Sequence, residues 1–129
     1  MLVYGHAWVD SPKFVKVFSL DDIEKTAPKD ILLLEPLNVS IDLAKHSQKN
    51  SLPFAVTVNT LKEAILANAI GANFILCQYE QAIDIQKIAN EYMFESRILV
   101  LINSEREIET MAHFGIDGVI FPQAITQVS

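Results

Sequence analysis

At 129 residues the chain is the size of one domain, and half of its residues are hydrophobic whereas only 20% are charged, which suits a sheet buried on both faces or a subunit interface. The formal net charge of −6, with ten basic residues scattered along the chain, excludes the positive stripe of a nucleic-acid-binding surface. No apolar run approaches the ~20 residues of a membrane span and the first ten residues do not form a signal peptide, so we expect a cytoplasmic protein with neither a nucleic-acid nor a membrane partner.

The first 30 residues are the least regular part of the chain. Residues 2–9 have the composition of a strand, and Pro12 marks a bend after it. Residues 14–18 predict either a second strand, paired antiparallel with the first as a hairpin, or an extended linker. Ser19 is placed to cap a short helix that ends before Pro28.

Five continuous apolar runs follow, and each predicts a strand that is buried on both faces. Their starts lie about 20 to 24 residues apart, which leaves room for one helix between each pair. Strands that alternate with helices at this spacing predict βαβ units and a parallel sheet. The runs are residues 31–37, 54–58, 74–78, 97–102 and 118–122.

The predicted helices carry their own start and stop signals. Ser40 precedes one of them, and Thr60 with Glu63 forms a capping box at the start of the next. The longest helix is expected over about residues 80–93, where isoleucines and alanines give it a broad apolar face. Ser104 with Glu107 forms a second capping box, for the last helix.

An internal repeat links two of these units. The stretch that begins at Val58 is echoed 44 positions later by the stretch that begins at Ile102, which matches two βα units of about 22 residues each. Without a gap, Asn, Thr or Ser, Glu and Gly recur in the same register. The matched pairs are Asn59 and Asn103, Thr60 and Ser104, Glu63 and Glu107, Gly71 and Gly115, and Asn73 and Asp117.

The phrases "ANAIGANFIL" and "AHFGIDGVIF" within this repeat resemble the helix-to-strand junctions of (βα)-barrel enzymes, and flavodoxin-like sheets use the same junctions. The resemblance covers roughly residues 31–122 and implies repeated βα units, preceded by an N-terminal segment over residues 1–30, in one domain of 129 residues. A closed barrel takes ~250 residues. We therefore expect an α/β fold in three layers, with a mostly parallel sheet of five or six strands, either an open doubly wound sheet or a half-barrel, covered by helices. The surplus of apolar residues predicts a homo-oligomer.

Both folds would gather ligands at the carboxyl ends of the strands. The side chains expected there are mostly amides, which can fix a polar ligand but do not transfer protons. Asn59 and Asn103 also precede helix caps, where Asn commonly bonds the backbone. The residues expected at these strand ends are Glu35, Asn38, Thr57, Asn59, Gln78, Asn103 and Gln123, of which Asn38, Asn59, Gln78 and Asn103 are the candidate ligand-binding residues.

Two residues are candidates for catalysis. Glu35 is a single carboxylate among apolar neighbours, a setting that can create a general acid or base. His6 stands with Trp8 and Asp10 at alternate positions, so on a strand the three side chains would share one face. The only cysteine, Cys77, lies within an apolar run, and we expect a buried, unreactive thiol.

The sequence contains no Gly-rich phosphate loop and no zinc-ligand spacing, so we expect neither a cofactor nor a metal. The inventory of acids and bases is thin. The favoured interpretation is therefore a non-catalytic, self-associating domain that binds a small polar ligand or a partner. The alternative is a small enzyme, or a relic of a barrel enzyme, whose site lies at the carboxyl ends of the parallel strands. The sequence does not decide whether the chain is an enzyme.

Overall fold

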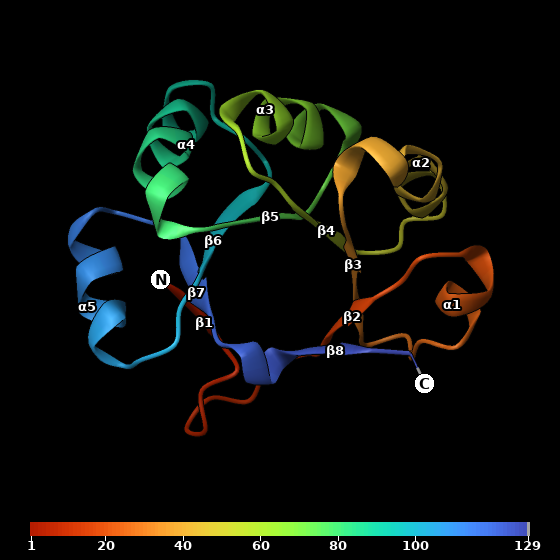
Figure 1. Ribbon diagram of the computed structural model, residues 1–129, viewed down its shortest axis with the longest axis horizontal. Helices are drawn as coiled ribbons and strands as arrows, with labels where there is room; N and C mark the ends of the chain where they lie inside the picture. Colours follow the sequence, from red (N-terminus) through yellow and green to blue (C-terminus); the bar gives the residue numbers. More distant parts are fainter. Residues whose placement is uncertain (129) are drawn as a thin grey trace.

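The computed structural model describes residues 1–128, and its strands form a single eight-stranded sheet in the order β1-β7-β6-β5-β4-β3-β2-β8. Every neighbouring pair runs parallel. The sheet curls, and the α-helices of the described residues lie along its outer face (Figure 1). The strands are β1 (Leu2–Tyr4), β2 (Phe14–Lys16), β3 (Ile31–Leu34), β4 (Phe54–Thr57), β5 (Phe74–Cys77), β6 (Arg97–Leu101), β7 (Gly118–Ile120) and β8 (Ile125–Gln127).

The helices alternate with the strands as the apolar spacing predicts. Each of the five predicted strands is present, and a helix precedes or follows each of them. The α/β class and the parallel direction of the sheet are therefore confirmed. The helices are α1 (Leu20–Glu24), α2 (Ile41–Lys49), α3 (Leu61–Ile70), α4 (Tyr79–Glu91) and α5 (Arg106–His113), with short 3₁₀ turns η1 (Leu37–Val39) and η2 (Pro122–Ala124).

The 44-residue repeat is reproduced in the hydrogen bonds. The Asn73 side chain accepts from the amide of Phe54 at 3.0 Å, and Asp117, 44 positions later, accepts from the amide of Ile98 at 2.9 Å. In each unit the side chain of the residue before a strand thus accepts a hydrogen bond from a backbone amide at the start of the neighbouring strand, the first residue of β4 and the second residue of β6. The two matched glycines, at positions 71 and 115, both take the left-handed backbone that ends a helix.

The two predicted capping boxes have one hydrogen bond in common, but only the first is complete, because the Glu107 amide donates to the Ser104 carbonyl at 3.1 Å and the Ser104 hydroxyl does not cap α5. The Glu63 carboxylate accepts from the Asn59 amide, and the Glu107 carboxylate accepts from the Asn103 amide, both at 2.9 Å. The Thr60 hydroxyl caps α3 by accepting from the Glu63 amide at 3.1 Å. Glu107 additionally accepts from the amide of Ser104, and these backbone hydrogen bonds hold the pKa of its carboxyl below the usual value.

The expected number of strands, five or six, is wrong because the sheet has eight. The strand expected over residues 2–9 and the strand that is one of the two alternatives for residues 14–18 are present as β1 and β2, each only three residues long, whereas β8 was not expected. No α-helix separates β8 from β7, so β8 lacks the strand-helix alternation that reveals the central strands. Both alternatives for residues 14–18 are wrong as stated: these residues contain the strand β2 and are not a linker, and they form no antiparallel hairpin with β1, because β1 pairs with β7 and β2 pairs with β3, both in parallel.

The three-layer arrangement is likewise not what the structure has, because the two faces of the curled sheet are covered differently. The outer face packs against the helices in one large cluster that includes Leu32, Val56 and Val100. The inner face packs against itself in a second cluster that includes Leu33 and Leu99. Adjacent residues of one strand thus enter different cores, which explains why the runs are continuously apolar.

One bent segment brings the two edges of the sheet together. In residues 118–127, β7 pairs with β1, the chain turns through η2, and β8 then pairs with β2. The Phe121 amide donates to the Tyr4 carbonyl at 2.9 Å, so pairing with β1 continues to the start of the turn. The same ten residues therefore pair with both β1 and β2, and Figure 1 shows the resulting ring of strands.

Gly5 allows this crossing because it lies directly against the bent segment. A Cβ atom on Gly5 would lie 3.0 Å from the Ala124 amide nitrogen and 3.1 Å from the Phe121 carbonyl oxygen. Its φ of +85° also falls in the left-handed region that glycine adopts at little cost. The chain leaves β1 at this residue, beneath η2.

We expect Gly5→Ala to lower the free energy of unfolding by about 2–5 kcal/mol, since it adds a steric clash to the left-handed backbone strain. Gly115→Ala is the matched control, because Gly115 has a φ of +70° and a Cβ atom added there would meet open space, with nothing within 4 Å. This control should cost only ~1–2 kcal/mol. Urea unfolding of both variants measures the difference, and equal losses would contradict the close contact at Gly5.

Candidate functional site

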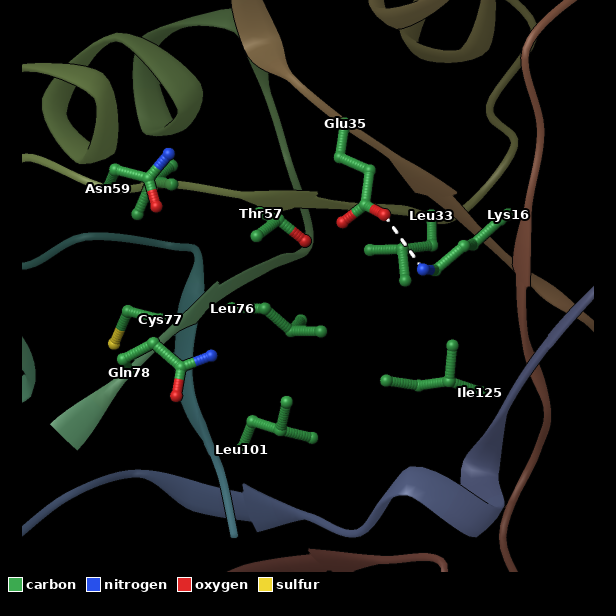
Figure 2. A pocket seen from close by; sticks show the side chains of 11 residues that line it. Lys16, Leu33, Glu35, Thr57, Asn59, Leu76, Cys77, Gln78, Leu101 and Ile125 are labelled. Atoms are coloured by element: carbon green, nitrogen blue, oxygen red, sulfur yellow. Dashed lines mark ion pairs between the residues drawn. The ribbon is translucent and has the colours of Figure 1, made fainter.

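A cavity of about 140 Å³ opens at the carboxyl ends of the central strands, inside the curl of the sheet (Figure 2). This is the edge where parallel sheets gather ligands. The cavity has an apolar floor and a polar rim, which come from different layers of inward-facing side chains. Its lining residues are Lys16, Leu33, Glu35, Thr57, Val58, Asn59, Leu76, Cys77, Gln78, Leu101 and Ile125.

The polar rim follows from the two-residue period of the strands. Phe14 and Leu33 face inward, so Lys16 and Glu35, two positions further along the chain, face inward at the next level. The Lys16 ammonium and the Glu35 carboxylate meet at 2.9 Å across neighbouring strands. Figure 2 shows this pair on one side of the cavity and the Thr57 hydroxyl beside it.

The apolar floor separates the cavity from the interior of the sheet. Leu33, Leu76 and Ile125 belong to the inner cluster. The same inner cluster holds three rings, Tyr4, Phe14 and Phe74, whose centroids lie 5.2 to 5.7 Å apart in edge-to-face contacts. Burial raises the pKa of the Tyr4 phenol above its usual value. The cavity is therefore a shallow mouth above a filled core and not a channel.

The Lys16–Glu35 ion pair contributes little to stability. The two side chains retain 34% and 28% of their accessible surface, and ion pairs with this much solvent contact are worth ~0–1 kcal/mol. Apolar side chains at both positions would extend the inner cluster upward and close the mouth. The pair instead leaves a cation, an anion and a hydroxyl facing one small volume, which can bind a polar molecule by complementary hydrogen bonds.

Three of the predicted site residues come together in this cavity. Glu35, Asn59 and Gln78 all line it, as does Thr57, which was expected at a strand end. Glu35 arises from the turn after β3, Asn59 from the turn after β4 and Gln78 from the turn after β5. These polar side chains thus lie together at the carboxyl ends of the strands, where the sequence predicts them.

The structure keeps the other two amides away from the cavity. Asn38 lies in η1, where its side chain is exposed. Asn103 is exposed at the start of the last βα unit, where its backbone amide bonds to Glu107. Neither residue lines the cavity within the part of the chain that the structure describes.

His6 is also placed apart from Glu35, so the two candidate catalytic residues do not form one site. The expected strand ends at Tyr4, and His6, Trp8 and Asp10 lie in the loop between β1 and β2. The His6 Nε2 atom lies 2.8 Å from the Glu105 carboxylate. The strand that would have aligned the three side chains is absent because Gly5 turns the chain out of the sheet.

Lys16 is the site residue that the sequence analysis missed. It lies in a three-residue strand whose partner the sequence does not identify, so the direction of its side chain could not be assigned. The alternation of Phe14 and Lys16 within "FVKVF" is the signal that could have placed it, once that run is taken as a strand of the parallel sheet.

Comparison with known proteins adds no further assignment. No protein-family model matches the chain, and the search of curated proteins returned no match. Among residues 1–128, no helix has the length and apolar character needed to cross a membrane. In the same residues no group of three or more His, Cys, Asp or Glu side chains is placed to hold a metal ion.

Cys77 borders the cavity but belongs to the outer cluster, where it is buried. Burial raises the pKa of its thiol to about 12 from 9.0. At pH 8 the reactive thiolate should therefore be about a thousandfold scarcer than in the unfolded chain. We expect a disulfide reagent such as dithionitrobenzoate to react with Cys77 only at the rate of unfolding, and rapid labelling of the native protein would contradict this burial.

Proposed function

We propose that the protein is a non-catalytic binding domain that holds a small polar molecule at the carboxyl ends of its parallel strands. The observation that carries the proposal is the inward-facing Lys16–Glu35 pair, 2.9 Å apart, above an otherwise apolar interior. This pair adds little to folding and keeps the mouth of the sheet polar. Binding of a ligand explains why Lys16 and Glu35 are polar at inward-facing positions where apolar side chains would pack.

The chemistry of the lining favours a ligand without net charge. One ammonium, one carboxylate, one hydroxyl and two amides line the cavity, so its formal charges cancel. Such a set offers both donors and acceptors to a zwitterion, a polyol or an amide. A phosphate ester would meet a single ammonium that Glu35 already neutralises. At ~30 Å³ for each water, the cavity has room for about four or five waters, which limits the enclosed part of the ligand to a few non-hydrogen atoms.

A small enzyme is the second candidate, and one observation favours it. Glu35 and Lys16 place a carboxylate and an amine side by side at the cavity, and such a pair can exchange protons with a bound substrate. His6 does not take part, because it lies on the loop after β1 and does not line the cavity.

Thermal unfolding in the presence of amino acids, polyols, small amides and phosphate esters tests both candidates. We expect at least one neutral class to raise the melting temperature of the wild type, since a ligand that binds only the folded state stabilises it by mass action. Glu35→Gln and Lys16→Met should fold normally and lose most of this shift. Glu91→Gln, an exposed change on α4, is the matched control and should keep it.

The proposal fails if no neutral class shifts the melting temperature, or if the two cavity variants respond as the wild type does. If the wild type converts a molecule that it binds, and Glu35→Gln abolishes this turnover without loss of folding, the enzyme interpretation replaces the non-catalytic one.

A further inference from the structure

Trp8, the only tryptophan of the chain, is an exposed aromatic side chain that is nevertheless held in place. It retains 89% of its accessible surface. Its backbone amide donates to His6 Nδ1 at 3.0 Å, and its ring meets the His6 ring edge to face at 5.3 Å. The His6 ring is fixed in turn by Glu105 and by an edge contact with Phe121. The Trp8 indole therefore extends into solvent with the His6 ring against one side of it.

The surface around Trp8 is apolar and acidic. A groove beside it is lined by Val3, Val9 and Ile108, together with the carboxylates of Glu105 and Glu109. No Lys or Arg lines this groove among the residues that the structure describes. The surface therefore suits a partner with an apolar recess and positive charge.

A pocket with these properties lies at the amino ends of the strands, on the opposite side of the inner core from the ligand cavity. Its volume of about 550 Å³ falls within the range of ~300–1,000 Å³ that accommodates organic groups. Pro12, Pro53 and Phe74 give it apolar walls, and the side chains of Lys29 and Arg97 stand beside them. Within residues 1–128, no carboxylate lies within 4.0 Å of either cation.

We propose that the protein associates head to tail, with Trp8 of one copy inserted into this basic pocket of the next. The indole would pack on the proline and phenylalanine walls and stack on the Arg97 guanidinium, while Glu105 and Glu109 would approach Lys29 and Arg97. Lys and Arg are the usual partners of an aromatic face, and here neither is paired within the described chain. The charges of the two surfaces are opposite, although Glu95 at the pocket reduces its positive charge.

Trp8 does not occupy the pocket of its own chain, because it is not among the residues that line it. Each copy therefore carries one Trp8 surface and one pocket, and the contact is heterologous, which builds a ring or a filament. Neither surface shares a residue with the lining of the ligand cavity. A variant can therefore lose association and keep ligand binding, or the reverse, so the two proposals are tested separately.

Two variants separate the two halves of the contact. Trp8→Ala keeps the pocket and loses the indole, whereas Arg97→Glu keeps the indole and reverses a charge of the pocket. At about 100 µM, where a contact with a micromolar Kd is populated, light scattering should find the wild type above the 14.4 kDa of one chain and each variant at that mass. An equimolar mixture of the two variants should form a heterodimer of twice that mass.

Fluorescence gives a second measurement on the same mixture. Trp8→Ala contains no tryptophan, so all indole emission comes from Trp8 of the Arg97→Glu copy. We expect this emission to move to shorter wavelength as Trp8→Ala is added, and the shift to weaken in 0.5 M salt. Lys62→Glu, an exposed charge reversal on α3, is the matched control and should associate as the wild type does. If Arg97→Glu does not fold, Lys29→Glu replaces it.

Three outcomes would overturn the proposal. A wild type that scatters as a monomer would show that Trp8 serves another partner or none. Association that survives in Trp8→Ala would show that copies meet through another surface. Variants that remain monomeric when mixed, with unchanged emission, would show that the indole and the pocket do not meet.

Discussion

The arrangement of this fold depends on how its sheet is closed. Residues 118–127 pair first with β1 and then with β2, so a single segment bonds one edge strand and supplies the other, β8. Exposed edges of parallel sheets are sites of unwanted pairing, and here each edge strand has only three residues. Closure also requires the chain to leave β1 sharply at Gly5, where the backbone of η2 leaves no space for a side chain.

Closure then determines which side chains fit on the inner face of the sheet. The interior is narrow, and it is filled by three mutually packed aromatic rings, Tyr4, Phe14 and Phe74, and by small residues such as Ala55. A Cβ on Gly118 would lie 2.7 Å from side-chain atoms of Leu2 and Leu99, so even a methyl group is excluded there. Because the rings and small residues fill the core, the inward-facing side chains nearer the carboxyl ends of the strands are not needed for packing and can be polar. Lys16 and Glu35 are these side chains. The amino ends of the strands form a different kind of opening, apolar and basic, which we assign to association.

The sequence predicts the regular part of this architecture and the location of the site, because both follow from local signals. Apolar runs at constant spacing, helix caps and the 44-residue repeat are sufficient to place the five strands and their parallel direction. Glu35, Asn59 and Gln78 line the same cavity because the residues that follow parallel strands share one edge of the sheet. What the sequence does not reveal is the pairing of the two N-terminal strands and the presence of β8, since both depend on segments that are distant along the chain. Lys16 was missed because the pairing of β2 was open, and His6 was misplaced because the chain leaves the sheet at Gly5.

Closure by the C-terminal segment is therefore the central claim, and it can be tested in solution. Nuclear Overhauser effects between backbone protons of β2 and β8 measure it most directly, because Val15 and Thr126 lie opposite each other in the parallel register. We expect cross-strand effects between these two strands and strand-like chemical shifts over residues 125–127. Random-coil shifts in those residues, with no contact to β2, would contradict the pairing of β8 with β2 and with it the closure of the sheet.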